Sequence, residues 1–209
     1  MVRSESWLLW GLLGLICLLP VWVASAEDKC KALKSIKEEL NSTLRRRYMK
    51  QNFPINYTIQ VHYEEVFRLR NISRLMNESD PSDIKYLQKL WLDVAMSSIK
   101  KILRVLPERH PTRTRYLTNL EELFKMSEQL LIDNLQEDDF PESIWNILER
   151  LKDPNYKGWR SVTPKSLLDN CYRTMHCLFR PCFQREGADD DYCNILHWRK
   201  RNGTTPQPT

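Results

Sequence analysis

Thiol and imidazole side chains gather near the C-terminal end of this sequence, where they could bind a metal ion or form disulfide bonds. The residues in question are Cys171, His176, Cys177, Cys182, Cys193 and His197. Structural zinc sites usually contain a C-x-x-C pair, and no two of these cysteines have that spacing. We therefore favour disulfide bonds over a zinc site, and we predict no cofactor.

Cys30 lies far from this cluster, at the opposite end of the chain. We expect one bond from Cys30 to the cluster and a second bond within it. The long-range bond would close a loop of well over 100 residues, which the chain-entropy model values at about 4–5 kcal/mol. Because Cys17 precedes the predicted cleavage site, the cysteine count is odd, and one thiol is left over or pairs between chains. The sequence leaves the pairing open.

Patterns of catalytic residues are missing. None of the four histidines lies in H-E-x-x-H, and neither G-x-S-x-G nor G-x-x-x-x-G-K-[ST] occurs. Only five glycines are present, so a loop that cradles phosphate is not expected. We predict that the protein is not an enzyme, although a triad assembled by folding would leave no motif.

The first residues have the pattern of a secretory signal peptide. Arg3 precedes an apolar stretch over residues 7–23, and Ala24-Ser25-Ala26 follows before charged residues. The alternative is a membrane anchor, but about 17 apolar residues is at the short limit for crossing a bilayer. We predict cleavage after residue 26 and secretion.

Glycosylation motifs agree with secretion. Five N-x-[ST] sequons occur, at Asn41, Asn56, Asn71, Asn77 and Asn202.

The formal net charge of +5 does not change when residues 1–26 are removed. This small excess of positive charge does not indicate nucleic-acid binding. It is what we expect of a protein that meets acidic extracellular surfaces. Basic runs at 45–47, 100–101, 109–115 and 199–201 could bind heparan sulfate, and the alternative is that they are solvated helix faces.

Four stretches have apolar residues at steps of three and four, which predicts long amphipathic helices. These are residues 29–50, 80–107, 114–135 and 163–181. Between the first two, alternation over residues 51–63 predicts a strand, and the polar residues 71–80 predict a loop. Between the last two, we expect a short helix after Pro141 and a strand near residues 159–162.

Two long connections among four helices favour the up-up-down-down bundle of helical cytokines. We therefore predict an all-α bundle whose crossovers carry a small β-ribbon and a short extra helix. The chain divides into a signal peptide (1–26), a helical cytokine domain (27–183) and a C-terminal disulfide-tied segment with a flexible tail (184–209).

One stretch is more specific than a helical pattern. Residues 48–75 read YMKQNFPINYTIQVHYEEVFRLRNISRL. This stretch closely resembles the interleukin-34 family, in which a YMK–FPINY–V–Y–VFR–N–[ST]RL run is distinctive. Residues 110–117 and the PKSLLDNCYR segment within residues 164–175 are also similar to that family. The resemblance covers residues 30–182.

The resemblance implies a secreted short-chain four-helix cytokine. It implies a non-covalent homodimer in which each protomer engages one macrophage colony-stimulating factor receptor, a tyrosine kinase, and promotes survival, proliferation and differentiation of monocytes and macrophages. Heparan or chondroitin sulfate proteoglycans and a receptor-type tyrosine phosphatase are further implied partners. Asn71 falls on the family's glycosylated asparagine.

The sequence also departs from the family. The family's C-terminal cysteine cluster is denser, Cys177 has no clear counterpart, and the second helix is more basic here than in mammalian relatives. We predict that the exposed face of this helix contacts the receptor through Ser97, Lys100, Lys101 and Arg104. The alternative from another class is a secreted heparin-binding helical protein without a signalling receptor.

Overall fold

The computed structural model describes residues 19–62, 64–78, 80–131, 135, 139–153, 155–184 and 190–200, and only the backbone of residues 19–26, 64, 65 and 200. The predictions for residues 1–18, for Asn202 and for the tail lie outside this part of the chain. Within it, no helix combines the length and the apolar character needed to cross a bilayer.

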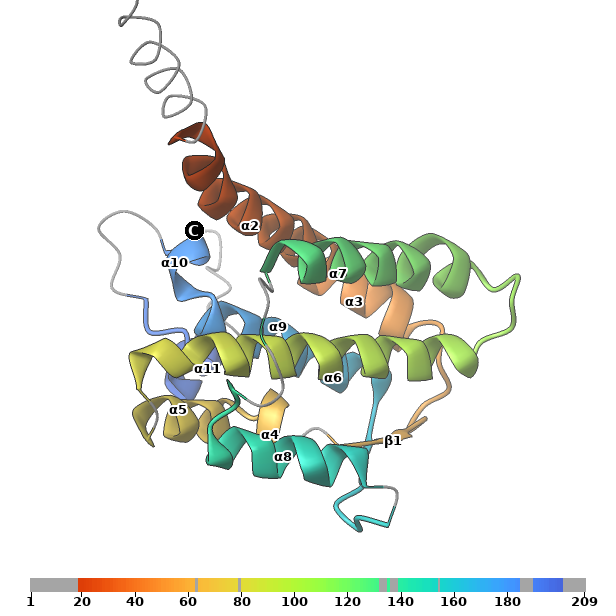
Figure 1. The fold of residues 1–209 in the computed structure, drawn as a ribbon. Coiled ribbons are helices and arrows are strands. Elements are labelled where there is room, and N and C mark those ends of the chain that lie inside the picture. Colours follow the sequence, from red (N-terminus) through yellow and green to blue (C-terminus); the bar gives the residue numbers. More distant parts are fainter. Residues whose placement is uncertain are drawn as a thin grey trace, which may run out of the picture.

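Four long helices form the body of the protein (Figure 1). They are α2 (Leu19–Glu39), α6 (Ile84–Arg104), α7 (Thr118–Leu131) and α9 (Pro164–Leu178). Helix α2 packs along α7, and α6 contacts both α7 and α9. Long connections join α2 to α6 and α7 to α9, as an up-up-down-down order requires.

The connections carry the smaller elements. The first contains α3 (Ser42–Arg45), the π-helical turn η1 (Arg46–Lys50), β1 (Ile59–Val61), α4 (Glu64–Phe67), α5 (Leu69–Glu78) and the 3-10 turn η2 (Pro81–Asp83). The π-helical turn η3 (Arg113–Leu117) leads into α7. The second connection contains α8 (Glu142–Lys152) and β2 (Arg160–Val162), and α10 (Arg180–Phe183) and α11 (Ile195–Lys200) follow α9.

Strands β1 and β2 pair antiparallel, with Ile59 opposite Val162 and Val61 opposite Arg160. This pairing joins the two long connections to each other at one side of the bundle. The predicted fold is therefore confirmed: a helical bundle whose crossovers carry a small β-ribbon and a short extra helix.

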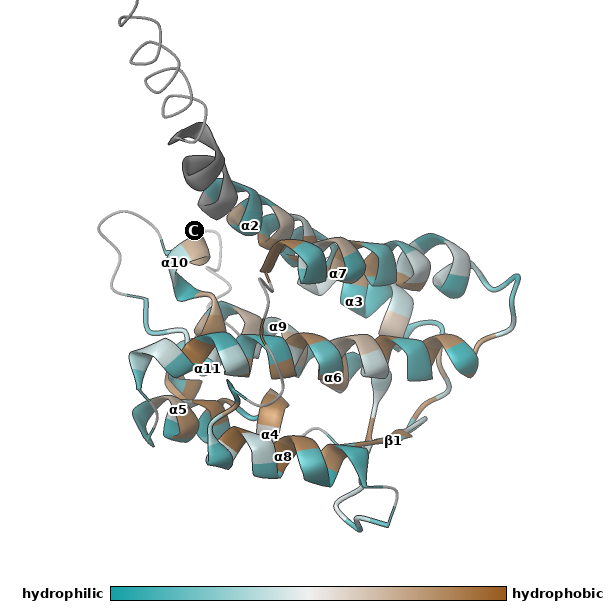
Figure 2. Cartoon of the chain, viewed as in Figure 1, coloured by the Kyte–Doolittle hydropathy of each residue, from teal (hydrophilic) through white to brown (hydrophobic). Residues whose placement is uncertain are grey.

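Apolar residues recur along the long helices between hydrophilic ones (Figure 2), and the buried ones form one core. Trp91 is fully buried at the centre of α6. Its ring lies 5.4 Å from Phe124 and 5.4 Å from Phe179, measured between centroids. Its indole N–H donates to Thr174 Oγ1 at 3.1 Å. One side chain thus connects α6 to α7 and α9 through both packing and a hydrogen bond.

Three sequence predictions about local structure are wrong in part. Residues 71–80, predicted as a loop, are mostly the helix α5, because Leu69, Ile72 and Leu75 form a buried stripe under the polar residues. The strand predicted over residues 51–63 is limited to the three residues of β1. Residues 51–56 form bends and turns instead, and Ile55 is 93% exposed.

The first long helix is interrupted where a single helix was predicted over residues 29–50. Helix α2 ends at Glu39, and Asn41 takes an extended conformation that starts α3. The Asn41 side chain accepts a hydrogen bond from the Leu44 amide at 2.9 Å, which is an N-cap. The short helices α4 and α11 were not predicted.

Candidate receptor-binding surface

Helix α6 positions the four residues that the sequence predicts as receptor contacts. Ser97, Lys100 and Arg104 are exposed and recur at steps of three and four, so they form one row. Lys101 is half-buried, and its side chain points toward Trp159. The buried residues between them, such as Ile99 and Ile102, hold the helix against the core and make the row rigid.

Lys101 reaches toward the β-ribbon, on which it meets an aromatic ring. Its ammonium nitrogen lies 4.5 Å from the centre of the Trp159 ring. The Trp159 ring is 3.7 Å from the ring of His62, between centroids. His62 directly follows β1 and Trp159 directly precedes β2, so the pairing of the two strands brings these rings together. Neither residue was predicted from the sequence as part of the site, because no local pattern indicated that pairing.

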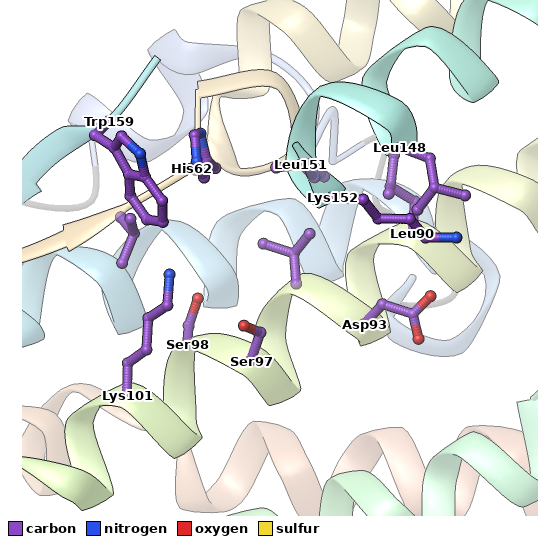
Figure 3. Close-up of a pocket in the computed structure, with 12 residues that line it drawn as sticks. His62, Leu90, Asp93, Ser97, Ser98, Lys101, Leu148, Leu151, Lys152 and Trp159 are labelled. Carbon is purple, nitrogen blue, oxygen red and sulfur yellow. The ribbon is translucent and has the colours of Figure 1, made fainter. Parts of the chain in front are cut away.

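A cleft of about 280 Å³ opens between α6, α8 and the β-ribbon (Figure 3). Apolar side chains form much of its wall, and polar side chains lie among them. The lining residues are Val61, His62, Leu90, Asp93, Val94, Ser97, Ser98, Lys101, Leu148, Leu151, Lys152 and Trp159. Ser97 and Lys101 belong both to this cleft and to the predicted contact residues. The cleft is thus continuous with the exposed row on α6.

Positive charge is poorly compensated at the Trp159 end of the cleft. Burial lowers the pKa of Lys101, and the nearby charge of Arg104 lowers it further. Burial also lowers the pKa of His62, with a second contribution from Lys101. At the other end, burial raises the pKa of Asp93, although Lys89 donates to its carboxylate at 2.6 Å. Asp93, the acidic residue of the cleft, is therefore already paired with Lys89.

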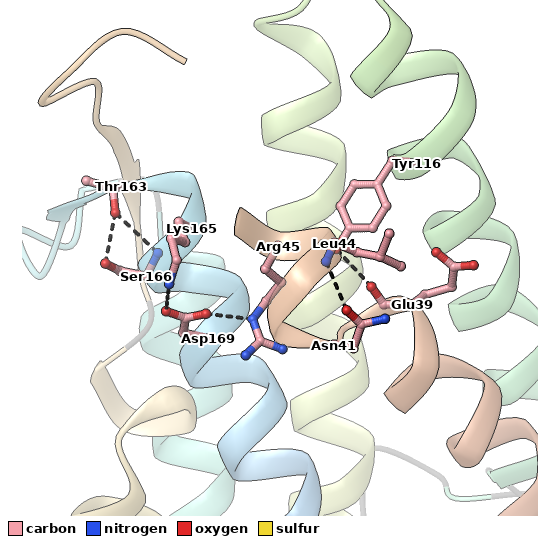
Figure 4. A network of polar contacts seen from close by, with 9 residues as sticks. All are labelled: Glu39, Asn41, Leu44, Arg45, Tyr116, Thr163, Lys165, Ser166 and Asp169. Atoms are coloured by element: carbon pink, nitrogen blue, oxygen red, sulfur yellow. Dashed lines mark hydrogen bonds and ion pairs between the residues drawn. The ribbon is translucent and has the colours of Figure 1, made fainter. Parts of the chain in front are cut away.

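The basic run at residues 45–47 is not a uniform surface. Arg46 and Arg47 are exposed, but Arg45 is buried and its Nε donates to Asp169 Oδ1 at 2.6 Å (Figure 4). Lys165 pairs with the same carboxylate. Arg45 therefore holds α3 against α9 and is not available to a polyanion.

The structure pairs four of the five candidate cysteines. One disulfide joins Cys30 to Cys182, and the other joins Cys177 to Cys193. Cys171 is a free, buried thiol. The odd cysteine count predicts one left-over thiol, and in this structure that thiol is Cys171, which lies on the inward face of α9 and is 2% exposed among core residues. Among the described residues, no group of histidine, cysteine and acidic side chains could hold a metal ion.

The sequons lie on different elements. Asn41 caps α3, and Asn56 is an exposed residue with a φ of 66°. Asn71 is half-buried and Asn77 exposed, both on α5. Asn56 and Asn77 are therefore the most accessible of the sequons in the described part of the chain.

A bundle of four long helices, with two long crossovers tied by a β-ribbon and with two disulfides, defines a short-chain helical cytokine. The chain matches the model of the family described as Interleukin 34 over residues 23–187, which is most of its length. It therefore belongs to the interleukin 34 family. The protein is a secreted cytokine, not an enzyme, and acts on macrophages through the colony-stimulating factor 1 receptor.

Proposed function

We propose that this cytokine binds its receptor through the exposed row Ser97, Lys100 and Arg104 of α6, together with Lys101, and that it acts as a homodimer holding two receptors together. The observation that supports the site is the row itself: polar and basic side chains on a rigid helix, next to a cleft. Charges at the rim of an interface mainly speed association, so an acidic receptor surface is the expected counterpart.

Surface plasmon resonance with the receptor ectodomain tests this site. The double variant Lys100→Glu/Arg104→Glu should associate about 10-fold more slowly than wild type, and the difference should shrink as salt screens the charges. Lys85→Glu is the matched control, because Lys85 is an exposed lysine at the other end of the same helix. Equal association rates for the double variant and wild type would exclude the site.

The dimer supplies the signalling step in this proposal. Two identical sites related by two-fold symmetry would engage two receptors in one membrane, and the second contact would gain from a high effective concentration. Ile55, in the connection before β1, is an apolar residue that is 93% exposed. We propose that the surface around Ile55 forms the self-contact.

Light scattering of the purified mature chain tests the dimer. Wild type should have twice the mass of a protomer, and Ile55→Asp should shift the protein to the mass of one protomer. Met126→Asp is the control, since Met126 is also an exposed apolar residue but lies on α7. A monomeric wild type at micromolar concentration would contradict the proposed dimer.

We further propose that the mature chain begins near Glu27, with residues 27–183 as the cytokine domain and 184–209 as a tied C-terminal segment. The Cys177–Cys193 disulfide supports this assignment, because it joins the C-terminal segment to α9.

Sulfated proteoglycans are proposed partners of exposed basic residues such as Arg46 and Arg47, and a receptor-type tyrosine phosphatase is a further proposed partner. Family membership favours the receptor over the alternative of a heparin-binding protein without one.

A further inference from the structure

The cleft beside Lys101 contains hydrogen-bonding atoms that lack partners. His62 is 9% exposed, and both of its ring nitrogens are buried without a hydrogen-bond partner. Buried polar atoms in native proteins nearly always have a partner. Since His62 lines the cleft, a ligand that enters the cleft would contact the ring that carries these nitrogens.

Lys101 lacks a negative partner in the same place. Its ammonium group lies over the Trp159 ring, and no carboxylate pairs with it in the part of the chain that the structure describes. Asp93, the acidic residue of the cleft, is bound to Lys89, which also pairs with Glu128 at 3.1 Å. A negative group arriving near Trp159 would therefore meet an uncompensated positive charge.

The rest of the cleft suits an apolar group. Val61, Val94, Leu148 and Leu151 line it, and the Trp159 ring, 42% exposed, forms its edge. The lowered pKa of His62 keeps its ring neutral near pH 7, so one ring nitrogen donates and the other accepts. The complementary ligand thus combines an apolar side chain with a carboxylate, which could accept a hydrogen bond from His62 and pair with Lys101.

We propose that this cleft receives an apolar side chain of the receptor together with an adjacent receptor carboxylate. This inference rests on the proposed receptor surface, because Ser97 and Lys101 belong to both the surface and the cleft. The carboxylate lies between Lys101 and His62, and the apolar side chain packs on Trp159. The contact supplies a desolvated centre beside the charged rim formed by Lys100 and Arg104, the arrangement expected of an interface hot spot.

Binding kinetics of the complete mature chain with the receptor ectodomain test the proposal. Lys101→Met keeps the apolar stem of the side chain and should raise the dissociation rate about 10-fold, and Trp159→Ala should do the same. Lys85→Met is the matched control, because Lys85 also lies on α6 with its ammonium 4.9 Å from an aromatic ring, that of Tyr86. The control should dissociate like wild type.

Small probes test the cleft without the receptor. In NMR spectra, indole-3-acetate, which joins an apolar ring to a carboxylate, should shift the resonances of the His62 ring and of the Trp159 indole N–H. Tryptamine, which has the same ring and a positive charge, should shift them far less. Equal shifts with both probes, or none, would overturn the proposal.

The outcomes separate this inference from the proposed function. If Lys100→Glu/Arg104→Glu leaves binding unchanged, the receptor surface itself is excluded, and the cleft proposal fails with it. If that variant weakens binding but Lys101→Met and Trp159→Ala dissociate like wild type, the surface stands and only the cleft proposal is overturned. The second result, combined with a shift by indole-3-acetate, would assign the cleft to a small free anion instead of the receptor.

Discussion

Arg45 and Asp169 are 124 positions apart in the sequence, yet Arg45 Nε donates to Asp169 Oδ1 at 2.6 Å. The Arg45 guanidinium also lies 4.5 Å from the centre of the Tyr172 ring. Both partners are on α9, so Arg45 fixes α3 to this helix just after the chain turns at Asn41. The break between α2 and α3 is thus stabilised by a partly buried ion pair.

Replacement of Arg45 tests this role. Arg45→Ala should lower the free energy of unfolding by about 2 kcal/mol, because it removes a charged hydrogen bond and a packed stem, while Lys165 still pairs with Asp169. Arg46→Ala, at an exposed neighbouring position, should change it by less than about 0.5 kcal/mol. Urea unfolding followed by circular dichroism measures both, and equal effects would contradict the account.

The two disulfides should contribute unequally to stability. Their cysteines are separated by 152 and 16 positions. In the chain-entropy model, replacing Cys30 and Cys182 with serine should cost about 4–5 kcal/mol, and replacing Cys177 and Cys193 about 3 kcal/mol. Mass spectrometry of unreduced peptides checks the pairing, and a peptide linked through Cys171 would contradict it.

The hydrogen bond between Trp91 and Thr174 should be measurable in a double-mutant cycle. Trp91→Phe should cost about 2 kcal/mol through the lost hydrogen bond and the space left in the core. Thr174→Val should be destabilising because the buried indole N–H then loses its acceptor. The two effects should couple by about 1 kcal/mol. Strictly additive effects would show that the hydrogen bond does not contribute.

His62 should make the stability depend on pH. Its pKa in the folded protein is lowered from the ordinary value of 6.5, so the folded state binds fewer protons than the unfolded state. The contribution of His62 to the free energy of unfolding is complete above pH 6.5 and is lost as the pH falls through that value. When the pH falls from about 7.5 to about 5.5, the free energy of unfolding should therefore decrease more for wild type than for His62→Leu.

Urea unfolding at both pH values measures this difference. The comparison stays above about pH 5.5 because the raised pKa of Asp93 acts in the opposite direction at lower pH. The same loss in wild type and in His62→Leu would show that His62 is not responsible.

Apolar periodicity was enough to predict the long helices, because each of them buries one continuous stripe. It failed for α5, where two sequons and several polar residues hid the stripe of Leu69, Ile72 and Leu75. The exposed face of a short helix is as polar as a loop, so composition alone could not distinguish them. The turn at Asn41 was missed for a related reason, because apolar residues continue in helical spacing across it.

The candidate site could be predicted only where it lies on one helix. Ser97, Lys100 and Arg104 could be predicted because the apolar periodicity of α6 shows which of its residues are exposed. Trp159 and His62 come from segments about 100 residues apart that meet through the pairing of β1 and β2. Three-residue strands carry too little pattern to reveal their partners, so the cleft emerges only in the folded protein.

Receptor phosphorylation in cells tests the central claim most directly. Purified mature protein should stimulate tyrosine phosphorylation of the colony-stimulating factor 1 receptor, and Lys85→Glu should match it. Lys100→Glu/Arg104→Glu should need about 10-fold more protein for the same response. A response from the double variant at wild-type concentrations would contradict the assignment of α6 as the receptor-binding helix.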